Sequence, residues 1–348
     1  MQYIDMHCDT LMRAYIEKKE TIYQVPEFML DIDRMRKGNC LAQYFAIFML
    51  QESMWEEAKG PFPNDLEYIK ALVNIFQKSM KEHSELIAPA GTIQELEENA
   101  SNGKISGILT LEDGRAVEGR MERLEWLHEQ GIRMITLTWN YENCFGYPNS
   151  EDRRIMQKGL KPFGREAIVR MNELGLAVDV SHLSDGGFWD VVKLSKKPFV
   201  ASHSNCRALS PHSRNMTDEM IRALAEKGGV MGLNFAGPFL NADAASREST
   251  LARMILHLKH MVKVGGIETP AIGTDFDGTE GIFDIPDCSK MHLLFETMGK
   301  HGFTEAQIEK IAYQNVKRVM GDIYLPSSPP GPSLRGTSSG IILSGRST

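Results

Sequence analysis

The chain has 348 residues, of which 42% are hydrophobic and 24% are charged, as in soluble globular proteins large enough to form one barrel or two domains. Its formal net charge of -7 disfavours a nucleic-acid or anionic-membrane partner, and no run approaches the ~18 apolar residues of a membrane span. The five cysteines are odd in number and scattered, which favours free thiols in a reducing compartment. The first predicted strand begins at Tyr3 and leaves no room for a signal peptide, so we expect a cytoplasmic protein.

Eight short apolar runs have the composition of buried strands. They are Tyr3–Cys8, Ala42–Met49, Ser106–Leu111, Arg133–Thr138, Ala177–Ser181, Phe199–Ser202, Val230–Phe235 and Ala271–Thr274. Amphipathic segments with helical periodicity separate or follow them. They include Leu66–Met80, Met121–Gln130, Gly164–Leu174, Asp218–Glu226 and Leu251–Val264 between the strands, and Ser289–Lys300 and Thr304–Met320 after the last one. Eight apolar strands alternating with helices predict an α/β fold, specifically a (β/α)8 TIM barrel with its functional groups at the C-terminal ends of the strands.

Two long insertions and a biased tail interrupt this alternation. The insertions follow the second strand (51–66) and the fourth strand (140–162), where barrel loops cover the mouth. Of the 23 residues from Pro326 onward, 15 are Pro, Ser or Gly. We therefore expect one catalytic barrel domain over 1–322 and a Pro/Ser/Gly-rich tail over 323–348 that is disordered or foreign to the fold.

Metal-ligating side chains fall at the ends of four predicted strands. His7 and Asp9 lie in Asp-Met-His-Cys-Asp and, in an extended strand, project to the same face. Glu112 follows the third strand, and His182 and His203 end two neighbouring strands 21 residues apart. Any one of these residues alone is more often structural, but their convergence at one end of a barrel predicts a metal site.

Five ligands exceed the needs of one tetrahedral zinc ion but suit two ions that share a carboxylate. The natural assignment places His7 and Asp9 on one ion, His182 and His203 on the other, and Glu112 across both. Imidazole and carboxylate donors without thiolate favour two Zn²⁺, with Mn²⁺ or Co²⁺ as alternatives. Water held between such ions ionises near neutral pH, so the expected reaction is metal-assisted hydrolysis by a bridging hydroxide.

Two further charged residues lie beside the predicted centre. Asp275, in Gly-Thr-Asp-Phe-Asp-Gly, is either a sixth ligand or a general base and acid, whereas Asp277 fits the following turn. Arg214 lies in a loop before a helix capped by Thr217, and its guanidinium suits an anionic end of a substrate. His257 and His260 lie one helical turn apart, and we interpret them as a surface or packing pair. The remaining histidines are interpreted as structural: His83, His128, His212, His292 and His301.

These motifs together resemble the membrane dipeptidase (renal dipeptidase) family of metal-dependent amidohydrolase barrels, over residues 1 to about 322. The matching pieces are Asp-Met-His-Cys-Asp (5–9), Leu-Glu-Asp-Gly (111–114), Ile-Thr-Leu-Thr (135–138), Pro-Phe-Gly (162–164), Val-Ser-His (180–182), Ser-His-Ser (202–204), Ser-Arg-Asn (213–215) and Gly-Thr-Asp-Phe-Asp-Gly (273–278). The resemblance implies a binuclear zinc site bridged by Glu112, Asp275 as proton carrier, Arg214 as a carboxylate-binding group and a possible homodimer. Family members often carry a histidine where this chain has Trp139, so Trp139 and Asn140 become candidate substrate-binding residues. We expect this chain to lack the secretion signal and lipid-anchor tail of animal members.

The predicted function is a zinc-dependent dipeptidase that acts on small dipeptides, with no nucleic-acid or membrane partner. Two alternatives stay open. One is another metal-dependent amide or lactam hydrolase, such as an N-acyl amino-acid deacylase, and the other is a barrel that binds metal and a peptide-like ligand without turnover.

Overall fold

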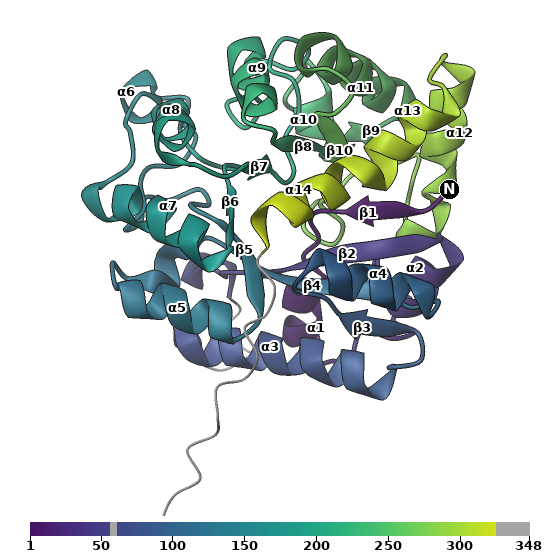
Figure 1. Cartoon of the computed structure of the whole chain (residues 1–348), viewed down its shortest axis with the longest axis horizontal. Helices are drawn as coiled ribbons and strands as arrows, with labels where there is room; N and C mark the ends of the chain where they lie inside the picture. The colour runs from purple at the N-terminus through teal and green to yellow at the C-terminus, as the bar shows by residue number, and fades with distance from the viewer. Residues whose placement is uncertain (56–60, 325–348) are drawn as a thin grey trace, which may run out of the picture.

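The computed structural model describes residues 1–55 and 61–324, which form a closed barrel of eight parallel strands (Figure 1). The barrel strands are β1 (Tyr3–Asp5), β2 (Cys40–Phe48), β4 (Ile105–Glu112), β5 (Ile132–Thr136), β6 (Ala177–Asp179), β7 (Val200–Ala201), β8 (Val230–Leu233) and β10 (Pro270–Ile272). Each strand pairs with the next in this order, and Asp5 of β1 pairs with Ile272 of β10 to close the ring. The predicted (β/α)8 barrel is therefore confirmed.

Helices surround the barrel and cover the outer face of its sheet (Figure 1). Those between the strands are α1 (Thr10–Ile16), α2 (Ile32–Lys37), α3 (Asp65–Glu82), α4 (Ile93–Ser101), α5 (Met121–Glu129), α6 (Arg153–Met156), α7 (Pro162–Leu174), α8 (Asp185–Leu194), α9 (Asp218–Glu226), α10 (Gly237–Leu240) and α11 (Leu251–Gly265). Those after β10 are α12 (His292–Lys300), α13 (Glu305–Glu309) and α14 (Asn315–Ile323), the last two joined by a π-helical turn at Lys310–Gln314. The strands are buried on both faces because helices cover one side and the barrel core fills the other.

Helix α14 closes the N-terminal end of the barrel and lies across the near side of the molecule in Figure 1. Its apolar face, which includes Val319 and Ile323, packs on residues near the strand starts such as Ile4 and Val230. Tyr324 is buried and its hydroxyl hydrogen-bonds that of Tyr44 at 3.4 Å, so the packed domain runs two residues past the predicted boundary at 322. The rest of the predicted tail, 325–348, lies outside the described residues.

The structure differs from the predicted elements in two ways. An unpredicted strand, β3 (Ile87–Pro89), pairs with the start of β4 outside the ring, and β9 (Glu248–Ser249) pairs with β11 (Ile282–Phe283) in a separate two-stranded sheet. Several barrel strands also end earlier than predicted. At β1 the reason is the buried carboxylate of Asp5, which accepts from the backbone N–H groups of His7 (3.3 Å) and Thr274 (2.9 Å).

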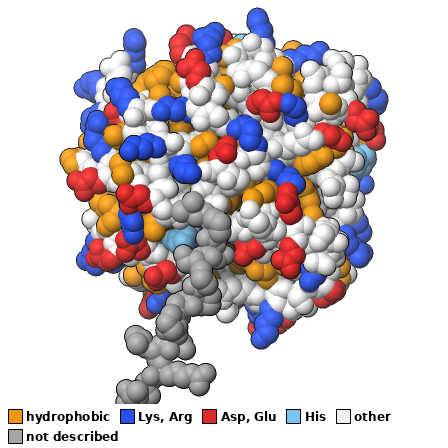
Figure 2. Space-filling model, viewed as in Figure 1, with side chains coloured by type: hydrophobic (Ala, Val, Ile, Leu, Met, Phe, Trp, Pro, Cys, Tyr) orange, Lys and Arg blue, Asp and Glu red, His pale blue; other side chains and the backbone are white. Residues whose placement is uncertain are grey.

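The two predicted insertions carry short local structure. The first contains a 3₁₀ turn at Glu52–Met54, and its residues 56–60 lie outside the described part. The second contains α6. Figure 2 shows Lys and Arg side chains interspersed with Asp and Glu over the visible face. Among the described residues, no helix combines the length and apolar character that crossing a membrane requires.

Candidate metal centre

The predicted ligands meet inside the C-terminal end of the barrel. His7 follows β1, Glu112 is the last residue of β4, His182 follows β6 and His203 follows β7. Asp9 lies immediately before α1. All five side chains are buried, with at most 8% of any residue exposed. Parallel strands bring these residues together because their C-terminal ends form one rim.

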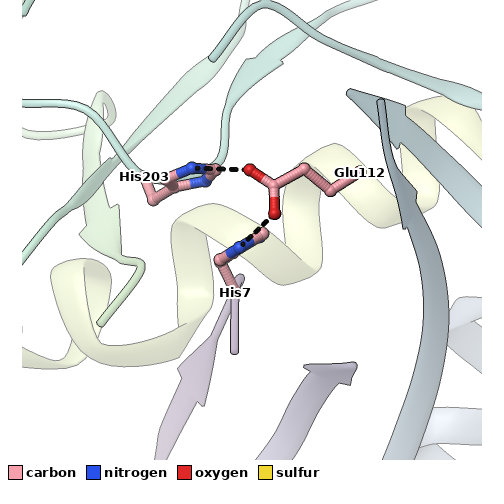
Figure 3. Close-up of side chains that lie close together, drawn as sticks. All are labelled: His7, Glu112 and His203. Carbon is pink, nitrogen blue, oxygen red and sulfur yellow. Dashed lines mark ion pairs between the residues drawn. The ribbon is translucent and has the colours of Figure 1, made fainter. Parts of the chain in front are cut away.

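Glu112 lies between His7 and His203 (Figure 3). Its Oε2 is 3.3 Å from His7 Nε2. Its Oε1 is 3.0 Å from His182 Nε2 and 3.5 Å from His203 Nε2. The two oxygens of one carboxylate therefore face separate sets of imidazoles, which is the arrangement that a bridging ligand requires.

A second set of carboxylates surrounds the imidazole of His7. Asp9 Oδ2 lies 3.7 Å from His7 Nε2, and Asp275 Oδ1 lies 3.9 Å from the same atom. Ligand atoms of His7, Asp9 and Asp275 lie within 4.8 Å of one another, and so do those of His7, Glu112 and His203. The geometry thus leaves open both roles predicted for Asp275, a further ligand or a proton carrier.

Two of these residues have left-handed backbone conformations that are uncommon for residues other than glycine. His182 has φ of 65° and Asp275 has φ of 64°. The carbonyl of His182 accepts from the backbone N–H of Asn149 at 2.7 Å, and the N–H of Asp275 donates to the His7 carbonyl at 3.2 Å. Such strain concentrates at functional sites, where surrounding contacts hold it in place.

Burial and mutual charge shift the ionisation of the cluster. Burial, with the nearby charges of Arg214 and His7, lowers the pKa of His182 and of His203 well below the usual value. For His7 burial also opposes charge, but the carboxylates of Glu112 and Asp9 outweigh it and raise its pKa. Burial raises the pKa of Glu112 to about 7 although His7 opposes the shift. Neutral imidazoles at 182 and 203 keep the lone pairs that a metal ion would use.

The donor set fits a divalent cation. His7 Nδ1, His7 Nε2 and Asp9 Oδ1 are buried polar atoms without a hydrogen-bond partner among the described residues. Unpartnered buried polar atoms are costly, and a cation bound to His7 and Asp9 would offset that cost. Cys8 lies between these residues in sequence, but its Sγ contacts the Tyr44 carbonyl at 3.5 Å and offers no thiolate to the centre. Imidazole nitrogens and carboxylate oxygens suit zinc, manganese or cobalt.

Arg214 reaches the centre from the loop after β7. It is 5% exposed, and its guanidinium donates to Ser204 Oγ at 3.3 Å and to the His203 carbonyl at 3.2 Å. Its Nε has no hydrogen-bond partner among the described residues. Its Cζ lies 5.3 Å from the centroid of the Phe239 ring. The buried guanidinium of Arg214 forms no ion pair with a carboxylate of the described residues, so it is suited to binding an anionic group.

Asp275 and Asp277 have different surroundings despite their proximity in sequence. Asp275 Oδ2 accepts from Asn234 Nδ2 at 2.9 Å, and burial raises its pKa to about 6. Asp277 accepts from Thr10 Oγ1 at 2.6 Å and from Arg13 Nη1 at 3.1 Å, away from the ligand cluster. Asp277 is therefore part of a buried structural network, whereas Asp275 faces the centre.

Trp139 and Asn140 border the cavity beside His182. The Trp139 ring lies 5.0 Å from that of Phe48 and 6.1 Å from that of His182. Asn140 Oδ1 lies 3.1 Å from His182 Nδ1, so this exposed residue contacts a predicted ligand directly. Their predicted substrate contacts stay predictions.

The centre opens into a cavity of about 840 Å³. Its walls include Trp139, Arg214, Phe239 and residues of both insertions, such as Met54 and Glu151. His212, interpreted from sequence as structural, also lines this cavity: its ring lies 4.8 Å from that of Phe239 and its Nδ1 accepts from the Arg214 N–H. The sequence signal for His212 was its position two residues before Arg214. His257 is fully buried between Cys206 and Leu240, and His260 Nε2 hydrogen-bonds Asp218 Oδ1 at 2.7 Å, as expected for a packing or surface pair.

Comparisons with known proteins give a consistent relationship. The chain is 31% identical over 224 residues to an uncharacterised protein of Klebsiella pneumoniae, covering 62% of this chain and 82% of that one. It is 34% identical over 222 residues to an uncharacterised dipeptidase of Schizosaccharomyces pombe, covering 63% of this chain and 53% of that protein.

Two solved structures share the fold over nearly the whole chain. A metallopeptidase of family M19, the dipeptidase AC, has a TM-score of 0.83 at 27% identity, covering 93% of this chain and 99% of that one. A metallopeptidase from Rhodobacter sphaeroides, bound to a phosphinate mimic of the dipeptide L-Ala-D-Ala, has a TM-score of 0.82 at 26% identity and the same coverage. A sequence model of one family matches residues 1–328. The chain therefore belongs to the membrane dipeptidase family (peptidase family M19).

Proposed function

We propose that this chain hydrolyses dipeptides with a free C-terminal carboxylate, using two zinc ions held by the five buried ligands. The observation that carries the proposal is the position of Glu112, whose two oxygens face His7 on one side and His182 and His203 on the other. His7 and Asp9 would hold one ion and His182 and His203 the other, with Glu112 shared. The ions, when bound, would activate water near neutral pH and polarise the peptide carbonyl.

The side chains around the ligands supply the remaining steps. Asp275 faces the cluster with one oxygen and is held by Asn234 through the other. In this proposal it would take a proton from water and return it to the leaving amine. Arg214 would hold the substrate carboxylate, which orients the peptide bond over the centre.

The cavity and a relative support the substrate class. A volume of about 840 Å³ admits a dipeptide with room for varied side chains. The Rhodobacter sphaeroides relative binds a phosphinate mimic of L-Ala-D-Ala, a dipeptide with a D-residue at its C-terminal position. We therefore expect this chain to accept dipeptides and include C-terminal D-residues among the substrates to test.

The test is a substrate panel measured on protein loaded with zinc. It contains L,L-dipeptides, L,D-dipeptides, their C-terminal amides and N-acyl amino acids, with metal content measured in the same samples. Hydrolysis of free dipeptides in preference to the other compounds supports the proposal. Turnover confined to N-acyl amino acids would assign a deacylase, and binding of dipeptides without turnover would assign a non-catalytic barrel.

A further inference from the structure

A buried chain of hydrogen bonds runs from His203 away from the metal centre. His203 Nδ1 lies 2.7 Å from Ser202 Oγ, and Ser202 Oγ lies 2.6 Å from Asp179 Oδ2. None of the three residues is more than 1% exposed. The chain therefore joins a predicted metal ligand to a carboxylate on β6 without contact with solvent.

Asp179 is surrounded by hydrogen-bond donors. Its Oδ1 accepts from the backbone N–H groups of Ser181 at 3.0 Å and Ser202 at 2.9 Å. Its Oδ2 accepts from the hydroxyls of Thr136 and Ser202, both at 2.6 Å. Four donors on two oxygens fit an ionised carboxylate, which can only accept.

The donor pattern fixes the proton on His203. The hydroxyl of Ser202 has one hydrogen, which it gives to Asp179, so only its lone pairs face His203. His203 must then donate from Nδ1, which leaves the lone pair on Nε2. That nitrogen is the one that lies 3.5 Å from Glu112 Oε1 and 3.1 Å from His182 Nε2.

We propose that Ser202 and Asp179 are positioning residues that hold His203 in the tautomer and ring orientation that a metal ion needs. Mutation of partners of this kind typically lowers metal affinity by roughly 10- to 100-fold. The inference rests on the proposed metal centre, but it concerns the affinity of one half of that centre rather than the substrate. It predicts that losing the Ser202 hydroxyl weakens binding at the His182 and His203 half.

The barrel provides a matched control at the ends of two other strands, β1 and β10. Thr274 Oγ1 donates to the buried carboxylate of Asp5 at 2.7 Å, as Ser202 does to Asp179. Neither ring nitrogen of His7 accepts or donates a hydrogen bond within the described residues, and the Thr274 hydroxyl contacts His7 at its backbone carbonyl (3.5 Å), not at its ring. Thr274→Val and Thr136→Val each remove a hydroxyl that donates to a buried aspartate, and both leave the Ser202–His203 contact in place.

The experiment titrates zinc into the metal-free full chain against a chromophoric chelator, which yields stepwise association constants. We expect Ser202→Ala to lower one of them by about 10- to 100-fold. Thr274→Val and Thr136→Val should leave both unchanged. Unchanged constants in Ser202→Ala, or an equal fall in the two control variants, would overturn the proposal.

A second measurement needs no variant at Ser202, so it can be made even if Ser202→Ala does not fold. Imidazole ¹⁵N spectra of the metal-free chain, with the His203 signals assigned by their loss in His203→Gln, report which ring nitrogen carries the proton. A protonated Nδ1 with an unprotonated Nε2 is expected, and the reverse would refute the assignment. Neither measurement involves a substrate. The positioning role of Ser202 and Asp179 can therefore be supported or overturned whether or not the chain hydrolyses dipeptides.

Discussion

Asn234 Nδ2 donates to Asp275 Oδ2 at 2.9 Å, which leaves Asp275 Oδ1 facing His7 Nε2 at 3.9 Å. The same amide also donates to the His203 carbonyl at 3.4 Å, so Asn234 connects the proposed proton carrier to the ligand loop after β7. One oxygen of Asp275 is thus fixed by the protein and the other is presented to the centre. This division is what a proton carrier that is not primarily a ligand requires.

Asp275→Asn should separate proton transfer from metal binding. The amide is nearly isosteric but cannot accept a proton from water, so kcat should fall by roughly 10²- to 10⁴-fold. Metal content, measured by elemental analysis of the same protein, should stay close to that of the unchanged chain. Loss of metal in proportion to activity would instead make Asp275 a ligand.

Arg214→Met should weaken binding of the substrate carboxylate. This interaction exists in both the ground state and the transition state, so its loss should change kcat little. KM should rise by a factor that corresponds to about 1.5–3 kcal/mol of lost binding free energy. The preference for a free dipeptide over its C-terminal amide should disappear. Arg247→Met is the control, because Arg247 lines the same cavity but is exposed and paired with Glu280. If Arg214→Met kept the preference, another residue would hold the carboxylate.

Glu112→Gln should reduce metal content from about two ions per chain and reduce activity with it. The amide can direct its one oxygen to His7 or to the His182 and His203 pair, but its NH₂ then faces the other side. Elemental analysis after dialysis at a fixed free zinc concentration measures the loss. The exposed Glu129→Gln serves as the charge-matched control. Two tightly held ions in Glu112→Gln would rule out a bridging role.

The barrel and the ligand cluster could be predicted because both depend on local patterns. Apolar runs mark the strands, and strand-end polar residues such as His182 and His203 must share a rim once the barrel closes. Asn234 could not be predicted this way, because its role depends on which side chains face it across the barrel. The link from Ser202 to Asp179 was missed for the same reason, since Ser and Asp near strand ends have no distinctive spacing.

The role of His257 was likewise accessible only from the fold. Its helical spacing with His260 indicated a surface or packing pair, but spacing cannot distinguish full burial from exposure. The structure places His257 against the Cys206 backbone and the Leu240 carbonyl, where tertiary packing decides its ionisation.

Gly278→Ala should disturb the centre without removing a ligand. A Cβ at this position would overlap Asp9 Oδ2 and lie 2.8 Å from Asp275 Oδ1, so both carboxylates would have to move. We expect lower zinc affinity and lower kcat together, measured by chelator competition and steady-state assay. Gly299→Ala is the control, because a Cβ there would meet only Ile308 at 3.9 Å. Normal affinity in Gly278→Ala would show that Asp9 is not held as the structure places it.

His257 should make folding sensitive to acid. Its Nδ1 accepts from the Cys206 N–H at 3.1 Å, and burial lowers its pKa from 6.5 to about 4. Because the unfolded chain takes up this proton first, the contribution of neutral His257 is complete above pH 6.5 and is lost as the pH falls towards 4. The loss is roughly 3 kcal/mol in the free energy of unfolding.

His257→Gln cannot be protonated, so its free energy of unfolding should fall less than that of the unchanged chain between pH 7 and pH 4.5, whatever its value at pH 7. Denaturant unfolding at a series of pH values measures this difference. The exposed His301→Gln should follow the unchanged chain. Acid loss of bound metal affects all three proteins through the same ligands, so it cancels in the comparison. Parallel pH curves for His257→Gln and the unchanged chain would show that His257 is not held neutral by the fold.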